Sequence, residues 1–75
     1  MELEKFITDF ANQFEDTDPS EISPSTVYKD LDEWSSILAF SVIAMVKVNY
    51  GKTVTGAEIR LCDTVEDLFN TIAAK

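Results

Sequence analysis

The chain has 75 residues, of which 45% are hydrophobic, and 14 acidic against 6 basic residues give it a formal net charge of −8. This length predicts one domain over residues 1–75, and the hydrophobic fraction excludes a disordered chain. The acidic balance argues against nucleic-acid binding, which needs lysine and arginine to neutralise phosphates. The absence of histidine from the sequence excludes His-dependent catalytic triads and the usual zinc ligand sets.

The sequence carries no visible signal for export or membrane insertion. Met1 is followed by Glu2 and Glu4 rather than by a basic and then an apolar segment, so no signal peptide is expected. The longest apolar-rich run, residues 37–48, is too short to span a bilayer. One cysteine, Cys62, cannot form an internal disulfide, and its apolar context predicts an inert thiol. A cytoplasmic protein is therefore expected.

The first helical pattern covers residues 2–14. Apolar side chains recur there at the spacing of one helix face, namely Leu3, Phe6, Ile7, Phe10, Ala11 and Phe14. This period predicts an amphipathic helix whose phenylalanines belong to the core. Residues 15–30 contain both prolines and are predicted to form a long loop. Ser25 or Thr26 would cap one short turn in it, and the expected anchors on the core are Ile22, Val27, Tyr28 and Leu31.

The next helix is predicted to be the central one. Residues 37–50 contain no acid, glycine or proline, which favours one helix of about four turns. Ser35 is the expected N-cap and Gly51 the expected left-handed C-cap. One face of the helix carries Leu38, Val42, Met45, Val46 and Asn49, and the adjacent face carries Ile37, Phe40, Ala44 and Val48. A small domain can hardly bury both faces, so the second face is expected to meet a partner.

Capping boxes predict two more helices near the C-terminus. Thr55 with Glu58 predicts a short helix that ends near Leu61, because each side chain can bond the backbone N–H of the other. The same signal precedes a last helix that reaches about residue 74, with the alternative boxes Asp63–Glu66 and Thr64–Asp67. The predicted fold is all-α, a four-helix bundle with three longer helices, one short third helix and a long first loop.

These features together resemble the acyl carrier protein family over residues 31–65. The second helix of that family opens with Asp-Ser-Leu, and the matching residues here are Ser35-Ser36-Ile37. The other matches are the aromatic-glycine helix end at Tyr50-Gly51, the extended step at Val54-Thr55, the short third helix through Ile59, and Thr64-Val65 at the start of the fourth helix.

The resemblance implies a carrier rather than an enzyme. A phosphopantetheinyl transferase would attach a 4′-phosphopantetheine arm from coenzyme A to Ser36, while Ser35 would serve as helix cap. The thiol of the arm would hold acyl or aminoacyl groups as thioesters for acyl-activating and acyl-transferring enzymes of fatty-acid, polyketide or lipid biosynthesis. A monomer without a metal site is expected, and the implied partner interface consists of Trp34, Ile37, Phe40 and Ala44.

Departures from the family pattern leave alternatives. Ser35 replaces an aspartate that helps the transferase of the family hold its metal ion, and Asp32 or Glu33 could supply that carboxylate. A helical module that binds a protein through the apolar patch without an arm is a second hypothesis. A third is a small enzyme or metal-binding protein that uses Asp30, Asp32 and Glu33. Trp34 is either a partner contact or an anchor of the loop on the core.

Overall fold

The computed structural model describes residues 2–75, and Met1, which the predicted domain includes, lies outside the described residues. The elements are α1 (Leu3–Ala11), the short 3-10 helices η1 (Pro19–Glu21) and η2 (Tyr28–Asp30), α2 (Ser36–Tyr50), α3 (Gly56–Leu61) and α4 (Val65–Ala73). Residues 2–75 contain no strand, so the predicted all-α class, with four helices and a long first loop, is confirmed. Among these helices, none combines the length and apolarity that crossing a membrane requires.

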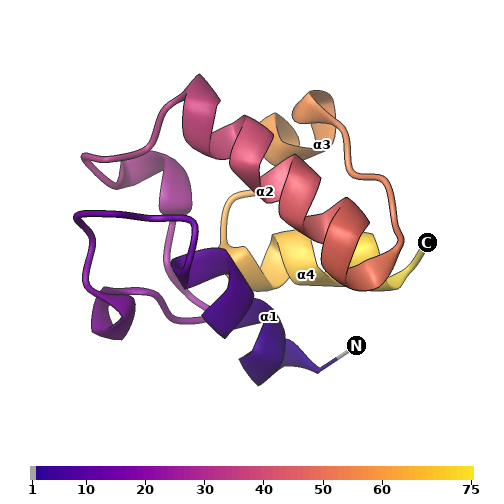
Figure 1. Ribbon diagram of the computed structural model, residues 1–75, viewed down its shortest axis with the longest axis horizontal. Coiled ribbons are helices and arrows are strands. Elements are labelled where there is room, and N and C mark those ends of the chain that lie inside the picture. Colours follow the sequence, from indigo (N-terminus) through magenta and orange to yellow (C-terminus); the bar gives the residue numbers. More distant parts are fainter. Residues whose placement is uncertain (1) are drawn as a thin grey trace.

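The four helices pack in a closed order. α2 lies between α1 and α3, and α4 contacts α1 and α3 on the other side (Figure 1). Phe6 of α1 and the C-terminal Lys75 both lie near the end of α2: the ammonium of Lys52 donates to the backbone oxygen of Lys75 at 3.0 Å, and the ring centroids of Phe6 and Tyr50 are 6.1 Å apart. The long loop lies at the other end, where α2 begins (Figure 1).

One hydrophobic core joins all four helices. Each helix turns apolar side chains inward, and α3 contributes Ile59; the other buried members include Phe6, Phe10, Val42, Val46, Val65, Leu68 and Ile72. On α2 the predicted inner face is confirmed for Leu38, Val42, Met45 and Val46, whereas Asn49 is exposed.

The predicted end of α1 at Phe14 is wrong, because the helix ends at Ala11. The chain then tightens, and the N–H groups of Gln13 and Phe14 donate to the carbonyls of Phe10 and Ala11. This tighter turn continues the direction of the helix, which explains why Phe14 is still buried.

Local capping signals decide the bounds of the later helices. Thr55 forms the predicted box with Glu58, and of the two alternatives for α4 the structure contains the box of Thr64 with Asp67. Gly51 ends α2 with a φ of 66°, a left-handed conformation that glycine adopts without steric cost.

The loop between α1 and α2 is more structured than predicted. Asp18 caps η1 in a capping box with Glu21. Neither Ser25 nor Thr26 caps η2, which begins without a side-chain cap. Thr26 instead accepts the N–H of Ser23 across a turn.

Tyr28 is the main anchor of this loop. It is fully buried, whereas Val27, another predicted anchor, is 39% exposed. The Tyr28 hydroxyl donates to the carbonyl of Ile59 and lies 3.1 Å from the carbonyl oxygen of Cys62, both at the end of α3. The loop therefore holds α3 in place. The remaining anchors behave as predicted, with Ile22 buried and Leu31 half-buried.

Candidate functional site

Ser36 is the first residue of α2 and is exposed. Ser35 before it is the N-cap, with an extended backbone and a hydroxyl that accepts the N–H of Leu38 at 3.4 Å. Within residues 2–75, the Ser36 hydroxyl has no hydrogen-bond partner. A nucleophilic oxygen is thus presented to solvent beside the positive end of a long helix.

A pocket of about 280 Å³ lies beside Ser36, between α2 and α3. Its lining is mostly apolar and comes from α2, α3 and the segments before them, namely Lys29, Trp34, Ser35, Ser36, Ala39, Phe40, Ile43, Gly56, Ile59 and Arg60. Two cations, Lys29 and Arg60, belong to this lining. A chain-like group attached to Ser36 would therefore find apolar surface and positive charge within reach.

Trp34 packs on the core, as the loop-anchor interpretation predicts. Its ring centroid lies 4.9 Å from that of Tyr28 and 6.3 Å from those of Phe10 and Phe14. The same side chain lines the pocket beside Ser36. Trp34 thus connects the core to the segment that presents the serine.

The outward face of α2 carries the predicted second row of apolar side chains, which we call the α2 stripe: Ile37, Phe40, Ala44 and Val48. Ile37, Phe40 and Val48 are 77%, 70% and 82% exposed, and Ala44 is exposed as well. Exposed apolar side chains in a contiguous row mark a surface for interaction.

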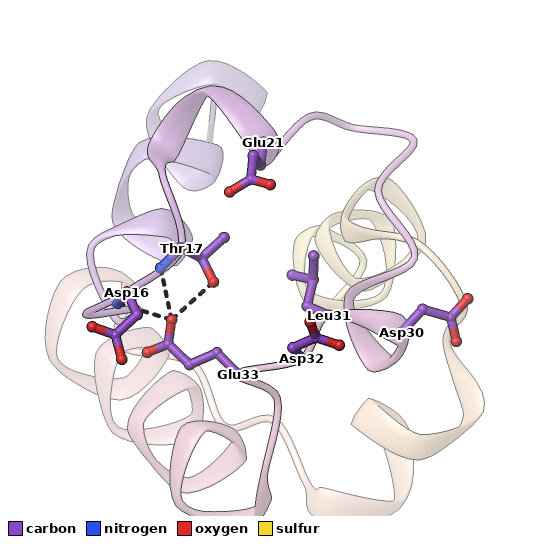
Figure 2. Close-up of a pocket in the computed structure, with 7 residues that line it drawn as sticks. All are labelled: Asp16, Thr17, Glu21, Asp30, Leu31, Asp32 and Glu33. Carbon is purple, nitrogen blue, oxygen red and sulfur yellow. Dashed lines mark hydrogen bonds between the residues drawn. The ribbon is translucent and has the colours of Figure 1, made fainter.

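A larger cavity of about 500 Å³ lies in the long loop and is lined largely by carboxylates (Figure 2). It does not include Ser36. The metal-binding hypothesis placed Asp30, Asp32 and Glu33 together, but in residues 2–75 no group of three or more His, Cys, Asp or Glu side chains could hold a metal ion. Figure 2 shows Asp30 on the far side of the cavity from Glu33. The three carboxylates of that hypothesis therefore do not converge on one point.

Glu33 is instead the cap of the loop after α1. Its carboxylate accepts the backbone N–H groups of Glu15 at 2.7 Å, Asp16 at 3.0 Å and Thr17 at 2.8 Å, and the Thr17 hydroxyl at 2.8 Å (Figure 2). These hydrogen bonds, of which the one from Glu15 has the largest effect, lower the pKa of Glu33. Desolvation raises this pKa, but by less than the hydrogen bonds together lower it.

This role bears on the hypothesis that Asp32 or Glu33 replaces the motif aspartate. The Glu33 carboxylate is already bound, whereas Asp32 is exposed in the segment that leads to Ser36. Sequence reasoning missed the Glu33 contacts because the partners are 16 to 18 residues away, beyond any local capping pattern.

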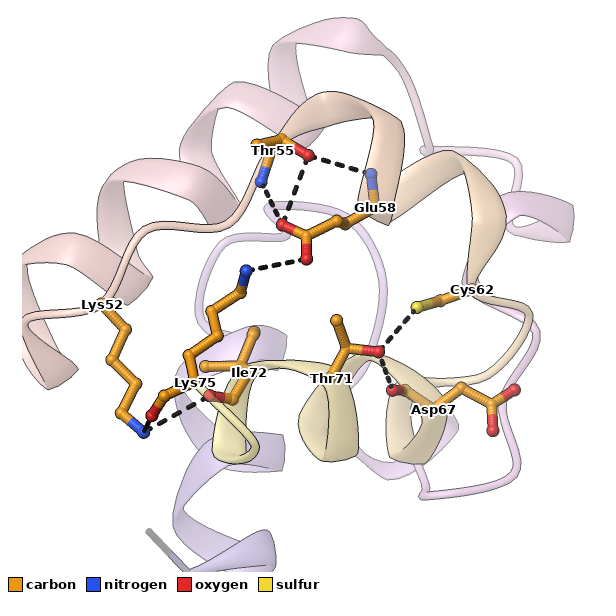
Figure 3. Close-up of polar contacts among 8 residues, drawn as sticks. All are labelled: Lys52, Thr55, Glu58, Cys62, Asp67, Thr71, Ile72 and Lys75. Carbon is orange, nitrogen blue, oxygen red and sulfur yellow. Dashed lines mark hydrogen bonds and ion pairs between the residues drawn. The ribbon is translucent and has the colours of Figure 1, made fainter.

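Polar contacts fix α3, the far wall of the pocket, against α4 (Figure 3). Lys75 forms a 2.7 Å ion pair with Glu58, whose pKa it lowers. The half-buried Cys62 thiol lies 3.4 Å from the hydroxyl of Thr71. These contacts come from the last turn of α4 and from the residues that follow it, and they reach Glu58 within α3 and Cys62 at its end.

The chain matches no known protein-family model, and searches of curated proteins and of solved structures found no match either. The chemistry of the site is therefore inferred from its own geometry. That geometry combines an exposed serine at a helix start, a pocket beside it and an apolar stripe that leads away from it.

Proposed function

We propose that this protein is a non-catalytic carrier that holds acyl or aminoacyl groups as thioesters on a 4′-phosphopantetheine arm attached to Ser36. The observation that carries the proposal is the position of the Ser36 hydroxyl, exposed in the first turn of α2. The N–H groups and dipole at this end of the helix favour the negative charge of a phosphodiester.

The pocket between α2 and α3 supports an arm at this position. Ala39, Phe40 and Ile43 offer apolar surface to the arm or its cargo, while Lys29 lies where it can attract phosphate. The pocket has one wall from α2 and one from α3, so it keeps its shape only if α3 stays in place. Tyr28 holds α3 on one side, and the contacts of Thr71 and Lys75 hold it on the other.

The loading step needs only a hydroxyl from this chain. The Ser36 oxygen would attack the phosphorus of coenzyme A that bears the pantetheine, forming a phosphodiester and releasing adenosine 3′,5′-bisphosphate, while the serine proton passes to a base of the transferase. Glu33 is closer to the serine in the chain, but its carboxylate is already bound. The exposed Asp32 is therefore the residue that we propose to replace the motif aspartate.

Intact-mass measurement after incubation with coenzyme A and a broad-specificity transferase tests the proposal. The wild type and Ser35→Ala should gain the mass of the arm, and Ser36→Ala should not. Ser35→Ala is the matched control, since it removes the adjacent hydroxyl at a cost of about 1 kcal/mol for a lost cap. An unmodified wild type with every transferase tried, or an arm on Ser36→Ala, would contradict the proposal.

A second candidate is a helical interaction module that carries no arm. Two observations favour it. Ser35 stands where the family has the motif aspartate, and the carboxylate of Glu33, which could replace that aspartate, is already bound to backbone N–H groups of the long loop. It predicts an unmodified mass for the protein from its native cells and tight partner binding by Ser36→Ala. An arm on the native protein would eliminate it.

A further inference from the structure

We infer that the α2 stripe docks on an apolar surface of a partner protein that is bordered by carboxylates, with Lys47 and Arg60 as the residues that read them. The inference deepens the proposed function and rests on it for the nature of the partner, an enzyme that meets the arm on Ser36. The inference assigns negative charge to the partner surface, whereas the net negative charge of this chain would by itself favour a basic partner.

The first observation is the distribution of charge. The chain has 14 acidic and 6 basic residues, yet α2 contains no acid and its one charged residue is Lys47. Lys47 is exposed, follows Ala44 by three positions and adjoins Val48, so it belongs to the same outward side of the helix. The acidic side chains instead gather elsewhere, for example around the loop cavity in Figure 2.

The second observation concerns which cations already have partners. Lys5, Lys29 and Lys75 form ion pairs with Asp9, Asp63 and Glu58. The ammonium of Lys52 donates to backbone oxygens at the end of α4. Within residues 2–75, Lys47 and Arg60 are the basic residues without an ion pair or a side-chain hydrogen bond.

These two cations flank the stripe. Arg60 is exposed and lines the same pocket as Phe40, and Lys47 lies about two helical turns beyond Phe40. In a chain with a charge of −8, cations that form no ion pair of their own gain most from carboxylates supplied by another molecule. Their place beside exposed apolar side chains joins the apolar and the electrostatic contact in one surface.

Charge also decides among the possible occupants. A basic partner surface would meet two cations here and no carboxylate on α2. A second copy of this chain would bring the same acid-free stripe and another charge of −8, so the copies would repel each other. An anionic membrane would present negative charge to the whole facing side of this chain, whereas carboxylates confined to the border of a partner's apolar surface would meet Lys47 and Arg60 alone. A protein surface that is apolar and locally acidic satisfies the stripe and both cations.

The experiment places a photo-crosslinking residue on the stripe as Ala44→benzoylphenylalanine in the full chain, in native cells. The crosslinked protein is identified by mass, purified and titrated with wild type, Lys47→Glu, Arg60→Glu and Lys5→Glu by calorimetry at low salt. Lys5→Glu is the matched control, since it makes the same charge change on α1. Circular dichroism verifies that each variant is folded.

Reversal of either flanking cation should weaken binding about fivefold to tenfold at low ionic strength, and the loss should shrink at high salt. Lys5→Glu should change the affinity by less than about twofold. Unchanged or tighter binding by Lys47→Glu and Arg60→Glu would overturn the inference. So would crosslinks only to lipid or to a second copy of the chain, or no crosslink at all.

The same titrations with Ser36→Ala separate the inference from the proposed function. If Ser36→Ala binds the partner and remains sensitive to Lys47→Glu, the docking inference stands even if Ser36 is never loaded. If Ser36 is loaded but binding is indifferent to both cations, the carrier function stands and the inference falls.

Discussion

The hydroxyl of Tyr28 links the long loop to α3, so its removal tests how the pocket beside Ser36 is held together. The side chain is fully buried, donates to the Ile59 carbonyl and lies 3.1 Å from the Cys62 carbonyl oxygen. In Tyr28→Phe the ring keeps its packing against Trp34, 4.9 Å away between centroids. The variant therefore removes the polar link and little else.

The expected loss is about 2 kcal/mol, from roughly 1 kcal/mol for a net hydrogen bond and a similar amount for a carbonyl left without a donor. A 75-residue domain has a free energy of unfolding of about 4–11 kcal/mol, so this loss is a large share of the total. It corresponds to a fall in melting temperature of about 10 °C for a chain of this size.

Urea unfolding followed by circular dichroism measures the loss, and hydrogen exchange shows where it acts. Amides of α3 should exchange faster in Tyr28→Phe than in the wild type. Tyr50→Phe is the matched control, since it removes a 2.6 Å bond to Asp9 at the other end of α2 and should leave exchange in α3 unchanged. If Tyr28→Phe unfolds at the wild-type urea concentration with α3 still protected, the hydroxyl does not hold α3 and the reasoning is refuted.

Two further predictions concern the backbone turn at Gly51 and the carboxylate of Glu33. Gly51→Ala should destabilise by about 1–2 kcal/mol because its φ is 66°, whereas Gly56→Ala, with ordinary φ and a 3.6 Å contact for the new Cβ, should stay within about 0.5 kcal/mol of wild type in urea unfolding. Equal responses of the two glycines would contradict the backbone argument. The N–H bonds hold the pKa of Glu33 in the folded state below its unfolded value of 4.5, so their stabilisation is present above that pH and is lost as pH falls through the folded pKa. Glu33→Gln should therefore unfold at a lower urea concentration than wild type at pH about 7, and the two should converge at pH about 2; a gap independent of pH would show that the charge of Glu33 is not responsible.

Much of the fold follows from signals that act over a few residues. The boxes at Thr55 and Thr64, the cap at Ser35 and the left-handed Gly51 each involve a side chain or backbone within one turn of its partner. The sequence alone therefore predicts the bounds of α2 and α3, and for α4 it leaves two alternative starts and an end at about residue 74, where the helix ends at Ala73. The exposure of the α2 stripe is predictable for a different reason, because a chain this short cannot surround a helix that is apolar on two faces.

The rest depends on contacts between distant residues. Periodicity extends α1 to Phe14, since a buried side chain in a tighter turn keeps the helical spacing. No pattern marks Glu33 as the acceptor of N–H groups 16 to 18 residues away, or Trp34 as a core anchor rather than a surface contact. Lys47 is visible in the sequence as an isolated charge, but its lack of an ion pair within residues 2–75 emerges only from the fold.

The place of the C-terminus has a practical consequence. Fifteen residues make α2 about 22 Å long, and both Phe6 and Lys75 lie near its last turn rather than near Ser36. A fluorescent fusion or a resin attached at the C-terminus would meet the end of α2 before it reached the serine. The protein can therefore be immobilised by its C-terminus with its first α2 turn facing free solution, and a tether of adjustable length would report how far along the helix an incoming enzyme extends.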